Sequence, residues 1–252
     1  MNKILNINLD RINSLPDLMV IDNFDYPDFI KNLFPCNDTD SASMIWNDRE
    51  YFSQDILVIN SNTKISDLYN FNSKNQLKEY LYNLEQWQSE NIINVEKLTE
   101  VKNLLNEYIG EDLIDLTIDF TKILKYLFEF NNDDYINEKI LLNWLEKEKN
   151  SSKKILIIDN FSNIKLSKLV GITCKYKIIV LSKNVFVHCD TFQDSEVCSF
   201  IYNNELYPIP DAKTFYEWLK YDLKLDLSEN EMLKMFQNDI FSYFSFKSKF
   251  FS

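Results

Sequence analysis

Short apolar runs and amphipathic stretches alternate over the first 90 residues. Lys3–Leu9 alternates polar and apolar residues, a pattern typical of a half-buried strand. Leu18–Ile21 is continuously apolar, which favours a strand buried on both faces of a parallel or mixed sheet. The same criteria predict strands over Ser43–Trp46 and Asp55–Ile59, and helices over Tyr26–Phe34 and Lys74–Gln88. This part of the chain therefore predicts mixed β and α structure.

The middle of the chain, from about Asn91 to Asn150, predicts helices only. Apolar residues recur there every three or four positions, as on one face of an α-helix. The stripes predict helices over Val95–Ile109, Asp112–Phe130 and Asp133–Lys149, joined by short polar turns. Stripes of this kind usually mark core packing, so they indicate architecture and not a binding site.

Strands return after this helical region. Strands are predicted over Lys154–Ile158 and Lys177–Leu181, in each of which a lysine precedes four apolar residues. A helix predicted over Asn163–Val170 would make the crossover between these two parallel strands. Weaker strands are predicted over Val185–His188, Glu196–Tyr202 and Glu205–Tyr207, followed by helices over Asp211–Tyr221 and Ser228–Phe244. The last residues, 244–251, are aromatic and basic, and we expect them to fray unless they dock on the fold.

Together these elements predict an α/β fold with a helical insertion. We expect an α/β head domain formed by residues 1–90 and 151–210, a helical leg domain over 91–150, and a C-terminal helical extension over 211–252. A length of 252 residues is comfortable for two domains.

Two rare residue types exclude several kinds of site. The two glycines, Gly110 and Gly171, lie too far apart for a phosphate-binding glycine loop or a dinucleotide-binding turn. The only histidine, His188, excludes zinc sites with paired histidines. His188 and Cys189 would point to opposite faces of the predicted strand, so we interpret His188 as a structural residue. A zinc site made of His188, Cys189 and Cys198 would lack a fourth ligand and the usual spacing, so free thiols in a reducing compartment are the simpler interpretation.

The charge is distributed unevenly. The whole chain carries a net charge of −12, yet Ser151–Val187 has seven lysines and a single acid, Asp159. This segment is therefore +6 and the remainder −18. A basic surface on an acidic protein can bind the DNA backbone, because phosphates respond to the local field. Alternatively, these lysines are the ordinary solvated ends of strands and helices.

Two groups of acids are candidates for chemistry. Ile21-Asp22-Asn23-Phe24 recurs as Ile158-Asp159-Asn160-Phe161, and a carboxylate that ends an apolar strand is what nucleotide-hydrolysing domains use to hold magnesium. The accompanying glycine loop is absent, so the sheet either lacks that chemistry or uses the acids only as strand caps. A metal-dependent nuclease or phosphotransferase that uses Asp22 and Asp159 stays open as an alternative function.

The second group lies in the helical region. Asp112, Asp115 and Asp119 are spaced to share one face of the predicted helix, and Glu111 precedes them. Carboxylates suit calcium or magnesium, so these four acids are the candidate metal ligands. A solvated acidic face near a helix N-terminus is the alternative interpretation.

The order of these elements resembles a known family. The strand Lys3–Leu9, the run Leu15–Asn23, the helical insertion, and Ser152–Phe161 leading to Lys177–Leu181 resemble the Csn-type adaptation proteins of type II-A CRISPR systems. The resemblance covers Met1–Leu181, and Val185–Ser252 would be an extension like that of the longer members.

The resemblance implies an α/β head similar to a P-loop NTPase without a phosphate loop, and a helical leg inserted into it. It further implies a non-enzymatic, ring-shaped homotetramer that binds double-stranded DNA ends during spacer acquisition in antiviral defence. Calcium would hold the leg against the head, and the partners would be the CRISPR integrase and the RNA-guided effector nuclease. Charge suggests the DNA-contacting residues, which are Lys122 and Lys125 on the leg and Lys153, Lys154, Lys165 and Lys168 on the head.

The sequence also predicts where the protein is located and leaves a third function open. No stretch approaches the ~18 apolar residues of a membrane span, and the N-terminus does not have the pattern of a signal peptide, so we expect no membrane association and a cytoplasmic location. A third function, a protein-interaction scaffold without DNA binding, would use the helical region and the aromatic tail as docking surfaces.

Overall fold

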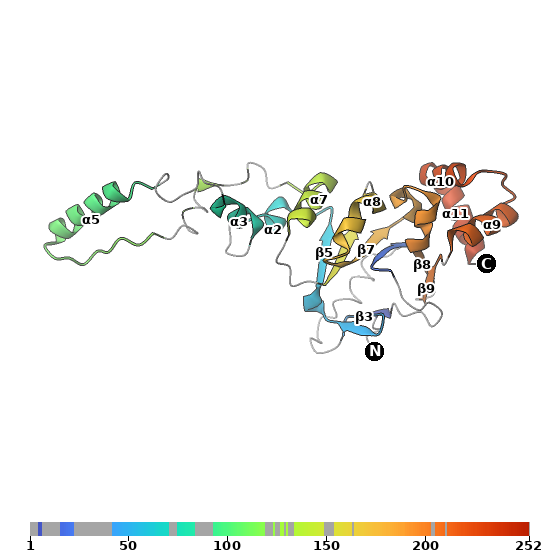
Figure 1. Cartoon of the computed structure of the whole chain (residues 1–252), viewed down its shortest axis with the longest axis horizontal. Helices are drawn as coiled ribbons and strands as arrows, with labels where there is room; N and C mark the ends of the chain where they lie inside the picture. The colour runs from blue at the N-terminus through green and yellow to red at the C-terminus, as the bar shows by residue number, and fades with distance from the viewer. Residues whose placement is uncertain are drawn as a thin grey trace. The chain divides into compact units, whose positions relative to one another are not determined.

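The computed structural model describes most of the chain, and its elements are drawn in Figure 1. The described residues are 5–6, 16–22, 42–70, 75–83, 93–118, 123, 127–128, 130, 134–148, 154–162, 164–202, 205–209 and 211–251. The helix predicted over Tyr26–Phe34 lies outside these ranges. The chain divides into two compact units, which comprise residues 1–62, 137–146 and 151–252 in unit 1 and residues 63–136 and 147–150 in unit 2. The predicted domain boundaries at residues 90, 150 and 210 stay a prediction.

A mostly parallel sheet forms the centre of unit 1, and it confirms the predicted α/β fold class. Its strands are, in spatial order, β5 (Ile56–Asn60), β6 (Ile155–Asp159), β7 (Lys177–Ser182), β2 (Leu18–Asp22), β8 (Cys198–Tyr202) and β9 (Glu205–Pro208). The strands from β5 to β8 run parallel and β9 is antiparallel. The central strands are buried over nearly their whole length, as their continuous apolar runs predict.

A smaller sheet covers one face of the large one. It consists of β1 (Leu5–Asn6), β3 (Met44–Trp46) and β4 (Arg49–Tyr51), in the order β1-β3-β4. Residues of the large sheet form one buried cluster with this sheet, namely Met19, Ile21, Ile56, Ile155, Ile157, Ile179 and Leu181 with Met44, Trp46 and Tyr51. In β2, β6 and β7 these residues alternate, because the two-residue period of a strand sends every second side chain to the same face.

Helices and turns complete unit 1. They are η1 (Ser53–Asp55), α7 (Glu138–Lys147, whose last residue belongs to unit 2), α8 (Leu166–Leu169), η3 (Val170–Ile172), η4 (Val185–His188), η5 (Phe192–Val197), α9 (Ala212–Leu223), α10 (Glu229–Asn238) and α11 (Ile240–Phe250). Figure 1 shows α9, α10 and α11 grouped beside β8 and β9. No helix in the described ranges has both the length and the apolar character that crossing a membrane requires.

Three predictions about unit 1 are wrong in detail. Val185–His188 is not a strand but the 3-10 helix η4, because the Asn184 side chain accepts the Phe186 N–H and starts a turn. The helix predicted over Ser228–Phe244 is broken at Asp239, whose carboxylate accepts the Phe241 N–H and caps a second helix. The predicted crossover helix is shorter than expected, and only α8 and η3 form within it.

The C-terminal tail docks on the fold and does not fray. Helix α11 spans most of it, and Tyr243 and Phe246 are fully buried. The Phe246 ring lies 5.3 Å from that of Phe236 and 5.5 Å from that of Phe200, centroid to centroid. Aromatic rings at such distances add favourable edge contacts to the area that they bury. These contacts join α11 to α10 and to the end of β8.

Unit 2 contains α2 (Ile65–Leu68), α3 (Gln76–Tyr82) and α5 (Val95–Ile109). Helix α5 has the predicted bounds. Asn94 caps its start by accepting the Lys97 N–H at 2.9 Å, and Gly110 ends it with a positive φ of 85°.

The helix predicted over Asp112–Phe130 is wrong over residues 112–118, which are irregular. The buried side chain of Asn106 provides the physical reason. Its Oδ1 accepts the backbone N–H groups of Leu113, at 3.1 Å, and Ile114, at 2.7 Å. Its Nδ2 donates to the Ile114 carbonyl and to a carboxylate oxygen of Asp112. After the Gly110 stop, this amide satisfies backbone groups that a helix would otherwise pair.

Candidate functional site

The carboxyl ends of the parallel strands place the two repeated Ile-Asp motifs at one edge of the sheet. In the strand register, Asn60 pairs with Asp159, Asp159 with Leu181, and Ser182 with Asp22. Asp22 and Asp159 therefore end two strands that are separated only by β7. Ligands of open α/β sheets bind at this edge, so it is the first place to look for a site.

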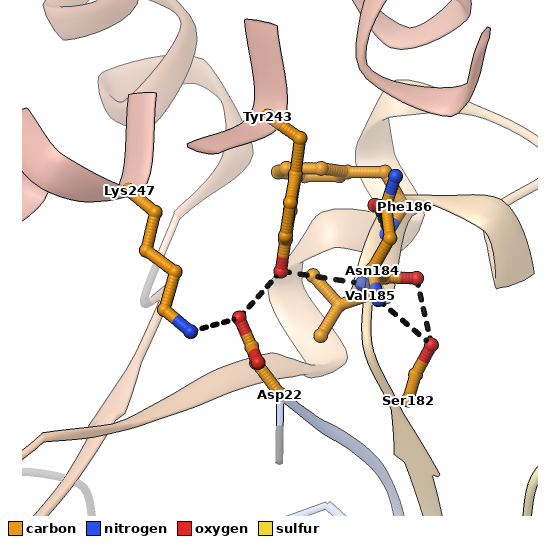
Figure 2. A network of polar contacts seen from close by, with 7 residues as sticks. All are labelled: Asp22, Ser182, Asn184, Val185, Phe186, Tyr243 and Lys247. Carbon is orange, nitrogen blue, oxygen red and sulfur yellow. Dashed lines mark hydrogen bonds and ion pairs between the residues drawn. The ribbon is translucent and has the colours of Figure 1, made fainter. Parts of the chain in front are cut away.

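Asp22 is fully buried and is engaged by the C-terminal helix. Tyr243 Oη donates to its Oδ2 at 2.6 Å, and Lys247 Nζ forms an ion pair with the same oxygen at 2.7 Å. Figure 2 shows both side chains descending from α11 onto the carboxylate. The other oxygen, Oδ1, has no hydrogen-bond partner among the described residues.

Burial sets the electrostatics of this network. It raises the pKa of Asp22, while the hydrogen bonds from Lys247 and Tyr243 and the charge of Lys247 oppose the rise. It also raises the pKa of Tyr243 above the usual phenol value, and the neighbouring Asp22 charge adds to that effect. Tyr243 therefore acts as a donor to Asp22 over the whole physiological range.

A polar layer holds Tyr243 in place. Its hydroxyl oxygen accepts the Val185 N–H at 3.5 Å, while the Asn184 side chain donates to the Phe236 carbonyl at 2.7 Å. Ser182, at the end of β7, donates to the Asn184 carbonyl (Figure 2). The turn after β7 and the two C-terminal helices are thus connected through the same residues that surround Asp22.

Asp159 has a different environment, because it lines an open pocket of about 440 Å³. The pocket lies at the ends of β5, β6 and β7 and is lined by polar residues that follow each strand, with Lys183 as its cationic member. Partial burial raises the pKa of Asp159 to about 6, although the Asn160 N–H and the charge of Lys183 oppose the rise. Asn160, at a positive φ of 60°, donates from its side chain to Ser61 Oγ at 2.7 Å.

Most of the described lysines in the basic segment Ser151–Val187 contact carbonyl or carboxylate oxygens of the protein itself. Lys165 Nζ donates to the carbonyls of Val187, at 2.7 Å, and Cys189, at 3.0 Å. Lys175 donates to two carbonyls near the end of α7. Lys177 pairs with Asp17, and its Nζ lies over the Trp46 ring, 5.3 Å from the ring centroid.

Of the predicted DNA-contacting lysines, three are described and three are not. Lys165 is held as stated above, Lys168 is exposed, and Lys154 pairs with Asp55 at 3.1 Å while its side chain stays 64% exposed. Lys122, Lys125 and Lys153 lie outside the described residues. Lys183, which was not among the predicted contacts, is also exposed.

Asp112 and Asp115, two of the predicted metal ligands, do not share a helical face, because residues 112–118 are irregular. Glu111, Asp112 and Asp115 are exposed, and Asp119 lies outside the described residues. Asp112 accepts from Asn106 and lies 3.9 Å from Lys102 Nζ. Within the described ranges, no three acids, histidines or cysteines lie close enough together to hold a metal ion.

His188 is a structural residue, as predicted, although it lies in a 3-10 helix and not on a strand. It is buried, and its Nδ1 lies 2.7 Å from the Ile164 carbonyl. Burial lowers the pKa of His188, so the ring is neutral and Nδ1 donates to the carbonyl.

Sequence reasoning identified both aspartates of the sheet edge but missed their different surroundings. The repeated Ile-Asp motif was a sufficient signal for the edge itself. Lys247 and Tyr243 gave no comparable signal, because their contact with Asp22 spans more than 220 residues of sequence.

The comparisons with known proteins give a structural likeness but no match by sequence. No family model and no curated protein sequence matches the chain. The fold is similar to the crystal structure of Stu0660 of Streptococcus thermophilus, a CRISPR-associated Csn2 protein, with a TM-score of 0.52. The two chains are 12% identical, and the similarity covers 89% of this chain and 81% of Stu0660. At this identity the likeness shows a shared fold.

Proposed function

We propose that this protein is a non-catalytic component of CRISPR spacer acquisition that binds the ends of double-stranded DNA as a ring-shaped homotetramer. The observation that carries the proposal is the shared fold with Stu0660, which extends over 89% of the chain. The order of elements in the sequence, which resembles that of Csn-type proteins, supports the same proposal.

The sheet edge supports a function without catalysis. A metal-dependent hydrolase needs acids whose oxygens are open to a cation. Oδ2 of Asp22 is already bound by Tyr243 and Lys247. Asp159 lines the pocket without a second acid among its lining residues. The chain also has no glycine loop to hold a nucleotide phosphate.

DNA binding in this proposal depends on exposed lysines. Lys168 and Lys183 are exposed in the basic segment, and Lys154 keeps most of its side chain in solvent. Contacts of this kind neutralise phosphates and release counterions, so the affinity should fall steeply with salt and depend little on sequence. Several copies around one ring would add avidity that a single subunit lacks.

Calcium and protein partners belong to the same proposal. Glu111, Asp112, Asp115 and Asp119 would supply carboxylate oxygens to calcium, which binds six to eight oxygen ligands. The integrase and the RNA-guided effector nuclease would be the protein partners. Size-exclusion chromatography with multi-angle light scattering, with and without calcium, tests both the tetramer and its dependence on the ion.

The decisive experiment is a mobility shift on linear and covalently closed circular DNA of the same sequence. We expect retention of the linear form only, stronger with calcium and lost at high salt. The double variant Lys168→Glu/Lys183→Glu should weaken binding at least tenfold, whereas Lys213→Glu, an exposed lysine of α9 outside the basic segment, should not. Equal binding to both DNA forms would refute ring threading, and no binding to either would favour an interaction scaffold.

A second candidate function comes from the Asp159 pocket. Its half-buried carboxylate has its pKa raised to about 6 and lies at the carboxyl edge of a parallel sheet, which is the observation that favours a metal-dependent nuclease or phosphotransferase, although the pocket offers a cation only one acid among its lining residues. This alternative requires magnesium-dependent turnover of DNA or a phosphate ester that Asp159→Ala abolishes. Lys183→Ala would provide a matched test of the other charged residue of the pocket.

A further inference from the structure

Two buried cysteines face each other across the turn that connects β7 to β8. Cys189 and Cys198 are both completely buried, and their sulfur atoms lie 3.7 Å apart. Cys189 follows η4 and Cys198 follows η5, so the pair brackets a short loop. We propose that these residues form a redox-active dithiol, which closes to an intramolecular disulfide when a peroxide reaches the protein.

The backbone on both sides of the pair is already fixed. The Cys189 carbonyl accepts from Lys165 Nζ and from Gln237 Nε2, each at 3.0 Å. Cys198 pairs with Val20 of β2 in the sheet, and its carbonyl accepts the Ile209 N–H at 3.0 Å. Because both anchors are rigid, closure rests on small side-chain rotations, which must bring the sulfurs from 3.7 Å to the ~2.05 Å of a disulfide.

The loop between the cysteines is preorganised as well. Asp194 accepts the N–H groups of Asp190, at 2.8 Å, and Thr191, at 2.7 Å, which closes a capping box within the loop. A loop that is ordered before reaction loses little conformational freedom when the disulfide forms, so the two thiols react at a high effective concentration.

The chemistry needs one peroxide molecule for each disulfide. One thiolate attacks the peroxide and breaks its O–O bond, which gives a sulfenic acid and releases water after proton transfer. The second sulfur then displaces the hydroxyl group, forms the S–S bond and releases a second water. Two electrons pass from the sulfurs to the peroxide, and both thiol protons end in water.

Burial controls when this reaction occurs. It raises the pKa of Cys198, and the hydrogen bond with Cys189 raises it further, so the closed fold keeps this thiol protonated and slow to react. The first step, attack on the peroxide, should therefore follow local opening of the η4–η5 segment, and the second step, closure of the disulfide, should follow its return to the ordered state. The disulfide would then lock a segment that carries Val187 and His188, two residues that line the Asp159 pocket.

The experiment exposes the full-length protein to hydrogen peroxide, followed by alkylation in denaturant and peptide mass mapping. We expect a Cys189–Cys198 disulfide that dithiothreitol reverses, and faster oxidation in urea below the unfolding transition. Closing a ten-residue loop should lower the unfolding equilibrium constant roughly 100-fold, measured by denaturation before and after reduction.

Variants separate this pair from the other thiols. Cys174→Ser removes an exposed cysteine and should leave the reaction unchanged, whereas Cys198→Ser should abolish it. The proposal is overturned if Cys189 and Cys198 remain fully alkylated under conditions that oxidise Cys174, or if the disulfide joins either of them to Cys36 or Cys174. The measurement on the unmodified chain needs no variant to fold, and it is independent of DNA binding.

Discussion

The buried ion pair between Lys247 and Asp22 leads to a quantitative prediction. Lys247→Met keeps much of the side-chain volume but removes the positive charge that balances a fully buried carboxylate. Breaking one partner of such a pair typically costs 3–5 kcal/mol. The Lys247 side chain is 18% exposed, so we expect the lower end, about 3 kcal/mol. For a chain of this size the thermal midpoint should fall by about 6–12 °C.

A matched control lies two residues further along the same helix. Lys249 is exposed and donates to the Asp222 carbonyl in a solvent-exposed contact, so Lys249→Met should change stability by less than about 0.5 kcal/mol. Circular dichroism during thermal and urea unfolding compares the two variants. The double variant Asp22→Asn/Lys247→Met should recover much of the stability that Lys247→Met loses, because no uncompensated charge remains beside Tyr243.

The pH dependence distinguishes charge from packing. Burial already raises the folded-state pKa of Asp22, and removing Lys247 removes the interactions that oppose the rise. In Lys247→Met, Asp22 therefore takes up a proton on folding, and the stability lost at pH 7 returns as the pH falls through its folded pKa towards the unfolded value. If the deficit is constant with pH, or equal to that of Lys249→Met, the electrostatic account of this network is refuted.

Three further predictions use other parts of the fold. Asp159→Asn should stabilise the protein at pH 7 by on the order of 1 kcal/mol, after a discount for solvent screening, because the folded-state pKa of about 6 makes the ionised carboxylate costly. In thermal melts this gain should vanish as the pH falls from 6 towards 4, and a variant that is no more stable than the parent at pH 7 would contradict the prediction. Phe246→Ala should cost about 3–5 kcal/mol through the cavity left in the aromatic cluster, while the exposed Phe241→Ala should cost less than about 0.5 kcal/mol in the same urea titration. Gly110→Ala should cost about 1 kcal/mol from the positive φ alone, since no atom lies within 4 Å of the added Cβ, whereas Gly171→Ala, with the same free space and no positive φ, should be neutral.

The central strands could be predicted from sequence because their pattern depends on burial alone. Leu18–Ile21 and Ile178–Leu181 are apolar without interruption, a pattern typical of short strands that are covered on both faces. The bounds of α5 were equally clear, since Asn94 and Gly110 are an N-cap and a C-cap that act locally.

The errors arose where a side chain competed with the expected backbone pattern. Residues 112–118 have apolar spacing that suits a helix, but the Asn106 amide occupies the N–H groups of that segment. Asp239 likewise interrupts a long apolar stripe by capping α11. Such hydrogen bonds cannot be predicted from hydropathy alone, because Asn106 and Asp239 would equally suit the exposed face of a helix.

The positions of Asp22 and Asp159 at the ends of their strands could be predicted from the sequence, but the surroundings of the two carboxylates could not. The repeated Ile-Asp motif placed Asp22 and Asp159 at the edge of the sheet, and the register confirms that placement. Neither the pocket beside Asp159 nor the cover over Asp22 follows from local sequence, because each depends on contacts between distant segments. The partners of Lys165 and Lys175 could not be predicted for the same reason, since both side chains donate to backbone carbonyls more than 20 residues away in sequence.

Asp22 is buried in an ion pair, whereas Asp159 lines an open pocket, and this difference bears on both stability and the proposed function. For Asp22 to bind a magnesium ion, Lys247 would have to leave, which costs as much as breaking the buried pair. Asp159 alone stays open, and a single half-buried carboxylate beside Lys183 offers a divalent cation one charged ligand and one repelling neighbour. The edge that would hold a metal in a nucleotide-hydrolysing sheet is thus closed at one acid by α11 and left incomplete at the other. This arrangement supports the proposal that the sheet acts as a scaffold and that exposed lysines, such as Lys168 and Lys183, contact DNA.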